Sequence, residues 1–259
     1  MIPAAFAGLE GQLLVWFLAM LRPGAAMLAA PLFGSAAVPV QVRLILALAV
    51  GIPAAAASGM VVPPEGVMSV PGLLLVAGEL VLGLSLGFAI QVGFAAALVA
   101  GEVIGNAMGL GFASMQDPTS GHSSTAIGQF LNLLGTVLFL CVGGHLALID
   151  IVIGSFRSLP PGAGWLAADA LRGLVEFGGL MFAAGLSIAL PVAFALVMVQ
   201  VVMGTITRSA PALNLFAVGI PATVLAGITL LAIATPVMAD AIDHALALAL
   251  DQSRLLAKL

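Results

Sequence analysis

The most chemically suggestive residues of this chain lie in one short polar segment near its middle. Asp117, Ser120, His122, Ser123 and Ser124 fall within eight residues and include the residue types of a hydrolytic triad. A triad needs a nucleophile, a base and an orienting acid that a scaffold holds in a fixed geometry. No G-x-S-x-G nucleophile elbow precedes the segment. We therefore predict no catalytic site here and expect a protein that is not an enzyme.

Metal binding is the second chemistry to consider. The histidines, His122, His145 and His244, are widely separated in the sequence. Zinc sites bring Cys, His and carboxylate ligands together at short, recognisable spacings. The sequence therefore predicts no metal centre, and we expect these histidines to be satisfied polar groups in a helix bundle.

Two glutamates bracket a charge-free stretch of 22 residues, Glu79 before it and Glu102 after it. A carboxylate at membrane depth is costly and indicates a proton relay or an ion pair. Two less specific interpretations are open: Glu79 near the positive dipole end of a helix start, and Glu102 paired with an arginine such as Arg22 or Arg43. We favour structural ion pairs for both glutamates. The alternative is a proton-coupled small-molecule transporter in which the two carboxylates carry the protons.

The elements that must position these residues are apolar. Residues 177–207 and 209–239 are two runs of 31 uncharged residues on either side of Arg208. Each exceeds the roughly 20 residues that a helix needs to cross a bilayer. The chain is 62% hydrophobic and 7% charged, with a mean hydropathy of +1.26. This composition is typical of a polytopic membrane protein, and it lacks the clustered basic face of a nucleic-acid-binding protein.

Apolar runs between charges and Pro/Gly clusters predict an all-α, membrane-embedded fold of about six hydrophobic helices. We expect these helices at 11–33, 44–62, 73–107, 126–153, 174–203 and 212–239. Prolines also fall inside or beside the apolar runs, at Pro23, Pro31, Pro53, Pro191, Pro221 and Pro236. Proline kinks a membrane helix, and neighbouring helices can satisfy the freed backbone groups. We therefore expect kinked helical hairpins packed against other helices.

Small residues recur every four positions along one side of the third predicted helix. They are Gly93, Ala97, Gly101, Gly105 and Gly109. This spacing lets another backbone approach closely, which is how helices associate in lipid. The ladder leads into a glycine-rich apolar segment that contains Met108, Phe112 and Met115 and ends at Asp117-Pro118. One interpretation is a flexible loop whose soft side chains fill a passage. The other is a helix C-cap followed by an ordinary turn, with the methionines anchoring it.

Three blocks of sequence, in register over nearly the whole chain, resemble the FliR family of flagellar export-gate proteins. The first block is Arg22-Pro23-Gly24, Pro31–Gly34, Val38-Pro39 and Arg43. The second runs from Gly101–Gly105 through Met108–Ala113 and Asp117-Pro118 to Gly128–Leu131, Gly144–Leu146, Ser155-Phe156 and Pro160. The third is Arg208–Phe216 with Gly219–Pro221. Ala212 departs from the pattern, because the family usually has a polar glutamine there.

The resemblance implies a structural subunit of a type III protein export gate in the bacterial inner membrane, within the flagellar basal body. It implies FliP-like and FliQ-like partners and a FlhB-like gate protein, with which the chain forms a helical, cone-shaped channel for unfolded flagellar proteins. Residues 1–160 would correspond to a FliP-like half and 161–259 to a FliQ-like hairpin, within a single membrane-embedded domain 1–259. No cofactor is implied, and the remaining contacts would be lipid, not nucleic acid. The sister family of the injectisome is the nearest alternative.

The resemblance also assigns roles to particular residues. The loop 105–118 matches the pore plug of the family, in which apolar side chains seal the channel. Its residues here are Gly105, Met108, Gly109, Leu110, Gly111, Phe112 and Met115. Residues expected in structural ion pairs or partner contacts are Arg22, Arg43, Glu79, Glu102, Arg208 and Asn214.

Overall fold

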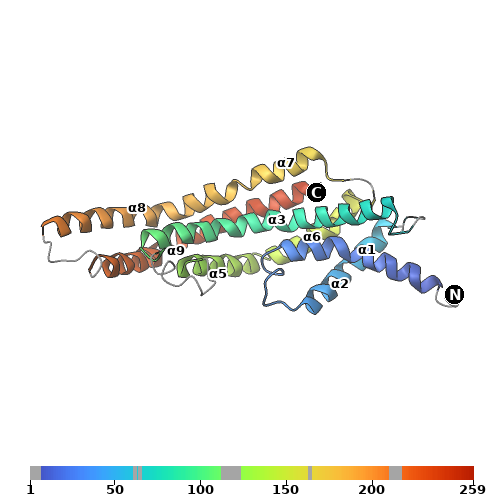
Figure 1. Ribbon diagram of the computed structural model, residues 1–259, viewed down its shortest axis with the longest axis horizontal. Coiled ribbons are helices and arrows are strands. Elements are labelled where there is room, and N and C mark those ends of the chain that lie inside the picture. The colour runs from blue at the N-terminus through green and yellow to red at the C-terminus, as the bar shows by residue number, and fades with distance from the viewer. Residues whose placement is uncertain (1–6, 61–62, 64–65, 112–123, 163–164, 210–217) are drawn as a thin grey trace. The chain divides into compact units, whose positions relative to one another are not determined.

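The computed structural model describes residues 7–60, 63, 66–111, 124–162, 165–209 and 218–259 (Figure 1). Over these residues the secondary structure is helical and contains no strand. The helices are α1 (Ala7–Ala29), α2 (Val40–Ser58), α3 (Val70–Ala107), α5 (Ala126–Cys141), α6 (Gly144–Ser158), α7 (Ala168–Phe177), α8 (Leu180–Ser209) and α9 (Ile220–Leu256). The predicted all-α class is confirmed.

Several of these helices are long and apolar enough to cross a bilayer. In the described residues there are five such spans: the first within α1, then α2, α3, the α7–α8 segment and α9. A sixth is obtained if α5 and α6, bent by 65° at their junction, form one span. The number of apolar segments long enough to span a bilayer, five or six among the described residues, therefore agrees with the sequence prediction of about six.

The last predicted helix is wrong at its C-terminal end. We expected it to stop at residue 239, before Asp240, but α9 continues to Leu256. The additional turns are amphipathic: Ile242, Ala245, Leu246 and Ala249 are buried, at the spacing of one helix face. A rule that ends helices at the first charge misses such a segment, because its charges lie on the opposite face.

The fourth predicted helix, 126–153, is two helices. Gly143 has φ +77°, the left-handed region, and separates α5 from α6. Glycine adopts this conformation without the steric cost that other residues incur. The Gly143-Gly144 pair was therefore the sequence signal for the bend. The pair Gly178-Gly179 also separates two helices, α7 and α8, within the predicted fifth helix, although Gly178 keeps the right-handed conformation with φ −53°.

The chain divides into two compact units. The first comprises residues 1–92, 142–178 and 248–259. In it, α1 packs against α2 and α6, and α2 packs against α6. A Cβ added at Gly83 or Gly87 of α3 would overlap the backbone carbonyls of Arg22 or Ala26 in α1, so α1 and α3 lie backbone to backbone.

The second unit comprises residues 93–141 and 179–247. The C-terminal part of α3 contacts α5 and α8. Phe94 of α3 and Phe139 of α5 form a T-shaped ring pair with centroids 5.3 Å apart. Gly185 of α8 lies against Ala96 of α3, and Gln200 of α8 donates to the Ala107 carbonyl. The C-terminal part of α3 is therefore held by contacts with both α5 and α8.

Candidate functional site

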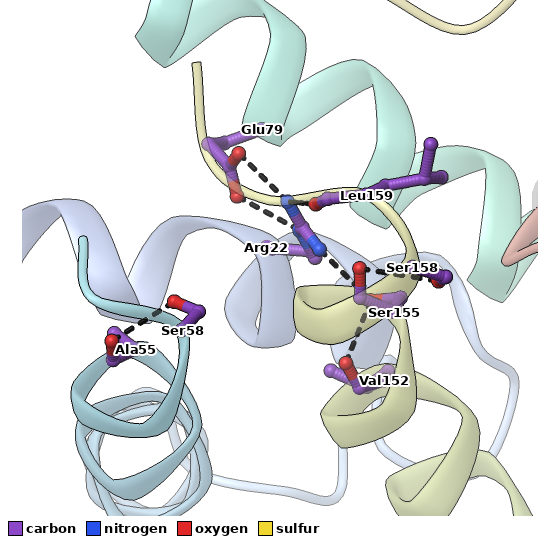
Figure 2. A network of polar contacts seen from close by, with 8 residues as sticks. All are labelled: Arg22, Ala55, Ser58, Glu79, Val152, Ser155, Ser158 and Leu159. Atoms are coloured by element: carbon purple, nitrogen blue, oxygen red, sulfur yellow. Dashed lines mark hydrogen bonds and ion pairs between the residues drawn. The ribbon is translucent and has the colours of Figure 1, made fainter. Parts of the chain in front are cut away.

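Among the described residues of the first unit, the buried charged side chains are Arg22 of α1 and Glu79 of α3. The Arg22 side chain is 1% exposed, and Figure 2 shows its polar contacts. Its Nε and Nη2 donate to the two carboxylate oxygens of Glu79 in α3, each at 2.8 Å. Nη2 also donates to the Leu159 carbonyl at 2.9 Å, and Nη1 donates to Ser155 Oγ at 3.0 Å. The bidentate geometry is the strongest that a guanidinium and a carboxylate can adopt.

This network, the Arg22 cluster, joins three helices. The guanidinium carbon lies 4.2 Å from the ring centroid of Phe156, which is fully buried in α6. Glu79 lies in the third turn of α3, beyond the first turn in which the helix dipole acts. The dipole therefore does not account for Glu79, and the buried ion pair does. We had considered Arg22 as the ion-pair partner of Glu102, but in the structure Arg22 pairs with Glu79.

Glu102, in the second unit, has a different partner. Its Oε1 accepts the backbone N–H of Thr125 at 2.7 Å and lies 3.3 Å from the Thr125 hydroxyl. In the structure Glu102 forms hydrogen bonds at the start of α5 in place of the expected ion pair with an arginine. Thr125 is a residue that sequence reasoning missed, although threonine just before an apolar helix is an N-cap signal.

The C-terminus of α3 is closed by glycine. Gly109 has φ +83°, its N–H donates to the Asn106 carbonyl, and the Leu110 N–H donates to the Gly105 carbonyl at 3.0 Å. These two bonds, around a left-handed glycine, form a Schellman motif. The predicted C-cap is therefore present at the start of the 105–118 segment.

Met108 lies at this C-cap with its side chain 1% exposed. A Cβ added at Gly227 of α9 would lie 2.6–2.8 Å from the Met108 side chain, so the two residues pack together. The Met108 carbonyl accepts a hydrogen bond from Thr223 Oγ1 at 3.2 Å. Leu110 and Gly111 are partly exposed. Phe112 and Met115 lie outside the described residues.

The small-residue ladder of α3 faces α5. A Cβ added at Gly101 would overlap the Cα of Gly128, and one added at Gly105 would lie 2.7 Å from Thr125 Oγ1. Ala97 is fully buried, and Gly93 is also buried. Gly109 belongs to the C-cap. Thus Gly101 and Gly105 allow close packing between helices of this same chain.

The remaining predicted residues are dispersed. Arg43 donates from Nη2 to the Ser35 carbonyl at 2.5 Å, and Arg208 is exposed in the last turn of α8. Asn214 lies outside the described residues, as do Asp117, Ser120, His122 and Ser123. Within the part of the chain that is described, no group of His, Cys, Asp and Glu residues could hold a metal ion.

Comparison with known proteins places this arrangement in a family. Residues 13–249 match the family described as "Bacterial export proteins, family 1". The chain is 35% identical to the flagellar biosynthetic protein FliR of Escherichia coli K12, over 89% of this chain and 87% of that protein. The chain belongs to the FliR family of bacterial export proteins.

Two further FliR relatives come from other bacteria. The flagellar biosynthetic protein FliR of Aquifex aeolicus is 32% identical, over 80% of each chain. That of Caulobacter vibrioides is 30% identical, over 86% of this chain and 88% of that protein. The resemblance read from the three sequence blocks is therefore confirmed over most of the chain.

Proposed function

We propose that this chain is a non-enzymatic structural subunit of the flagellar type III export gate. With FliP-like and FliQ-like subunits, and next to a FlhB-like protein, it would form the channel that carries unfolded flagellar proteins across the inner membrane. The observation that carries this proposal is the family match over residues 13–249, to relatives that are named as flagellar biosynthetic proteins.

The structure supports this proposal through its surface. Large apolar side chains remain exposed along α8 and α9, for example Phe182, Phe194, Leu225 and Ile233 at 61–72% exposure. Such residues need lipid or other subunits as their surroundings. We also propose that residues 1–160 resemble the FliP-like partner and that residues 161–259 resemble the FliQ-like partner. This correspondence stays a prediction.

Co-expression tests the proposed subunit role. We expect the chain to be extracted in mild detergent as a stable complex when it is produced with the FliP-like and FliQ-like proteins of the same bacterium, and to aggregate when produced alone. A proton-coupled transporter, in contrast, would be stable and bind its small-molecule substrate alone. A monodisperse, ligand-binding protein obtained without partners would therefore refute the gate proposal.

Within the gate, we propose that the 105–118 segment is the pore plug. Its base is the C-cap of α3, where Met108 is already engaged with Gly227. Leu110, Phe112 and Met115 would then supply the apolar side chains that exclude ions. A passing polypeptide would displace them. The sister gate of the injectisome would use the same arrangement, and the flagellar names of the relatives favour the flagellar system.

Deletion of residues 109–115 should make the closed gate permeable to small ions while the subunits still co-purify. The reason is that the apolar filling is lost and the helices that contact other subunits are kept. Membrane conductance of cells that express the complete gate measures this. A second variant keeps the length of the segment and replaces the same residues with Gly and Ser. It should also leak, because the apolar side chains are lost while the segment is not shortened. If neither variant raises the conductance, the sealing role is wrong.

A further inference from the structure

The start of α5 carries an incomplete capping arrangement. Thr125 immediately precedes the helix, and its Oγ1 accepts the backbone N–H of Gly128 at 3.0 Å. This makes Thr125 the N-cap residue and places Gly128 at position N3. In a capping box, a glutamate or glutamine at N3 reaches back to accept the N-cap backbone N–H. Glycine at N3 cannot do so, because it has no side chain.

Glu102 of α3 supplies the missing acceptor from another helix. Its Oε1 accepts the Thr125 backbone N–H at 2.7 Å, which is the bond an N3 glutamate would make. A Cβ added at Gly128 would lie 2.5 Å from Glu102 Oε1 and 3.4 Å from its Cδ. The Glu102 carboxylate therefore occupies the space that a side chain at position 128 would fill. A carboxylate here is also favoured by the positive end of the α5 dipole.

The neighbouring glycines make this geometry accessible. The backbones of Gly101 and Gly128 meet directly, and Gly105 leaves room for the Thr125 side chain. Without these close approaches, the Glu102 carboxylate and the Thr125 N–H would be held further apart. We name this arrangement the α3–α5 clamp. It consists of the polar pair Glu102–Thr125 and the glycines at 101, 105 and 128.

The C-terminal end of α3, where the connection to α5 begins, is also held by hydrogen bonds. The Ala107 carbonyl accepts from Gln200 Nε2 of α8 at 2.5 Å, and the Met108 carbonyl accepts from Thr223 Oγ1 of α9 at 3.2 Å. The chain therefore leaves α3 from a point tied to α8 and α9. It returns at Thr125, to a point tied to α3 itself.

We propose that Glu102 is a positioning residue that completes the capping box of α5 from α3 and thereby fixes where the connection between the two helices returns. Together with the anchored C-cap of α3, it gives the connection a rigid base. Only the consequence for ion sealing rests on the plug function proposed above. The clamp itself is a claim about Glu102, Thr125 and Gly128.

The test moves the capping glutamate from position 102 of α3 to position 128 of α5. The variants are made in the full-length chain and co-purified with its partner subunits. Glu102→Ala should speed amide hydrogen exchange at the start of α5 by about tenfold to a hundredfold, because a charge-assisted hydrogen bond is lost. The double variant E102A/G128E moves the carboxylate to N3. It should restore exchange to within about threefold of the parent.

Gly128→Ala adds a second, independent measurement. With Glu102 present, the new Cβ meets the carboxylate, and exchange at the start of α5 should rise. In the E102A background the same substitution should have a much smaller effect, since the neighbour that then remains closest to the new Cβ is Leu98 Cδ1 at 3.3 Å, the end of a flexible side chain. Glu176→Ala, which removes an exposed carboxylate from α7, is the matched control and should leave α5 unchanged.

Two results would overturn the clamp: unchanged exchange in E102A, or an equal effect of G128A in both backgrounds. If E102A does not accumulate, recovered accumulation in E102A/G128E supports the clamp, and failure to recover overturns it. Conductance of the complete gate separates this proposal from the plug. Faster exchange in E102A without any ion leak would uphold the clamp and show that ion sealing does not depend on it, while the 109–115 variants test the plug itself.

Discussion

Replacing Glu79 with alanine is expected to lower the free energy of unfolding by about 3–5 kcal/mol, the largest effect of any single substitution that we consider. Arg22 is 1% exposed and donates to both Glu79 oxygens at 2.8 Å. Without the carboxylate, the guanidinium remains buried with its charge uncompensated. The fall in the thermal midpoint of the chain in its co-purified complex, in mild detergent, measures the loss.

Two comparisons show whether burial is the cause. Glu176 forms an ion pair with Arg172 in which both side chains are at least 69% exposed, and Glu176→Ala should change stability by less than about 1 kcal/mol. The double variant R22M/E79L removes both buried charges and should be more stable than E79A. If E79A is no worse than E176A, the Arg22 cluster does not stabilise the fold.

Substitution of Gly101 by leucine is expected to separate α3 from α5 and to prevent co-purification with the partner subunits. The added Cβ would overlap the Gly128 Cα and lie 2.8 Å from the Ile127 carbonyl oxygen. These are backbone atoms, which cannot rotate out of the way as a side chain can. Overpacking of this kind costs about 1–3 kcal/mol or more. Gel filtration of the co-expressed complex measures the outcome.

The matched control for Gly101 lies in the same helix. A Cβ added at Gly78 of α3 meets nothing within 4 Å, so Gly78→Ala should leave the complex intact. Gly101→Ala should already weaken the complex, because the first carbon causes the overlap. A complex of normal yield and stability with Gly101→Leu would contradict the close packing of α3 on α5.

The helices could be predicted from the sequence because their signal is local. Charge-free runs marked α3 and α8, and glycine or proline clusters marked most connections. The prediction failed where two signals competed. We predicted that the last helix ends before Asp240, but α9 continues to Leu256 because its apolar face continues beyond that charge. The glycine pair Gly143-Gly144 was taken as part of a continuous helix and is the bend.

The pairing of the polar groups could not be predicted from the sequence. Composition marks Arg22, Glu79 and Glu102 as costly charges, but their partners depend on which helix faces lie together. Arg22 pairs with a residue 57 positions away. Glu102 meets the N-terminus of α5 because two glycines let the backbones touch. The tip of the proposed plug lies outside the described residues, so Phe112 and Met115 stay predictions.

The Arg22 cluster has a consequence for synthesis. The ribosome adds Glu79 57 residues after Arg22, which at ordinary elongation rates is a delay of about 3–11 s. During that interval the first helix carries a cation whose neutralising partner does not yet exist, and an unpaired arginine enters hydrocarbon at high cost. We therefore expect the nascent first helix to keep Arg22 in a polar environment, such as the lipid headgroups, until the third helix emerges.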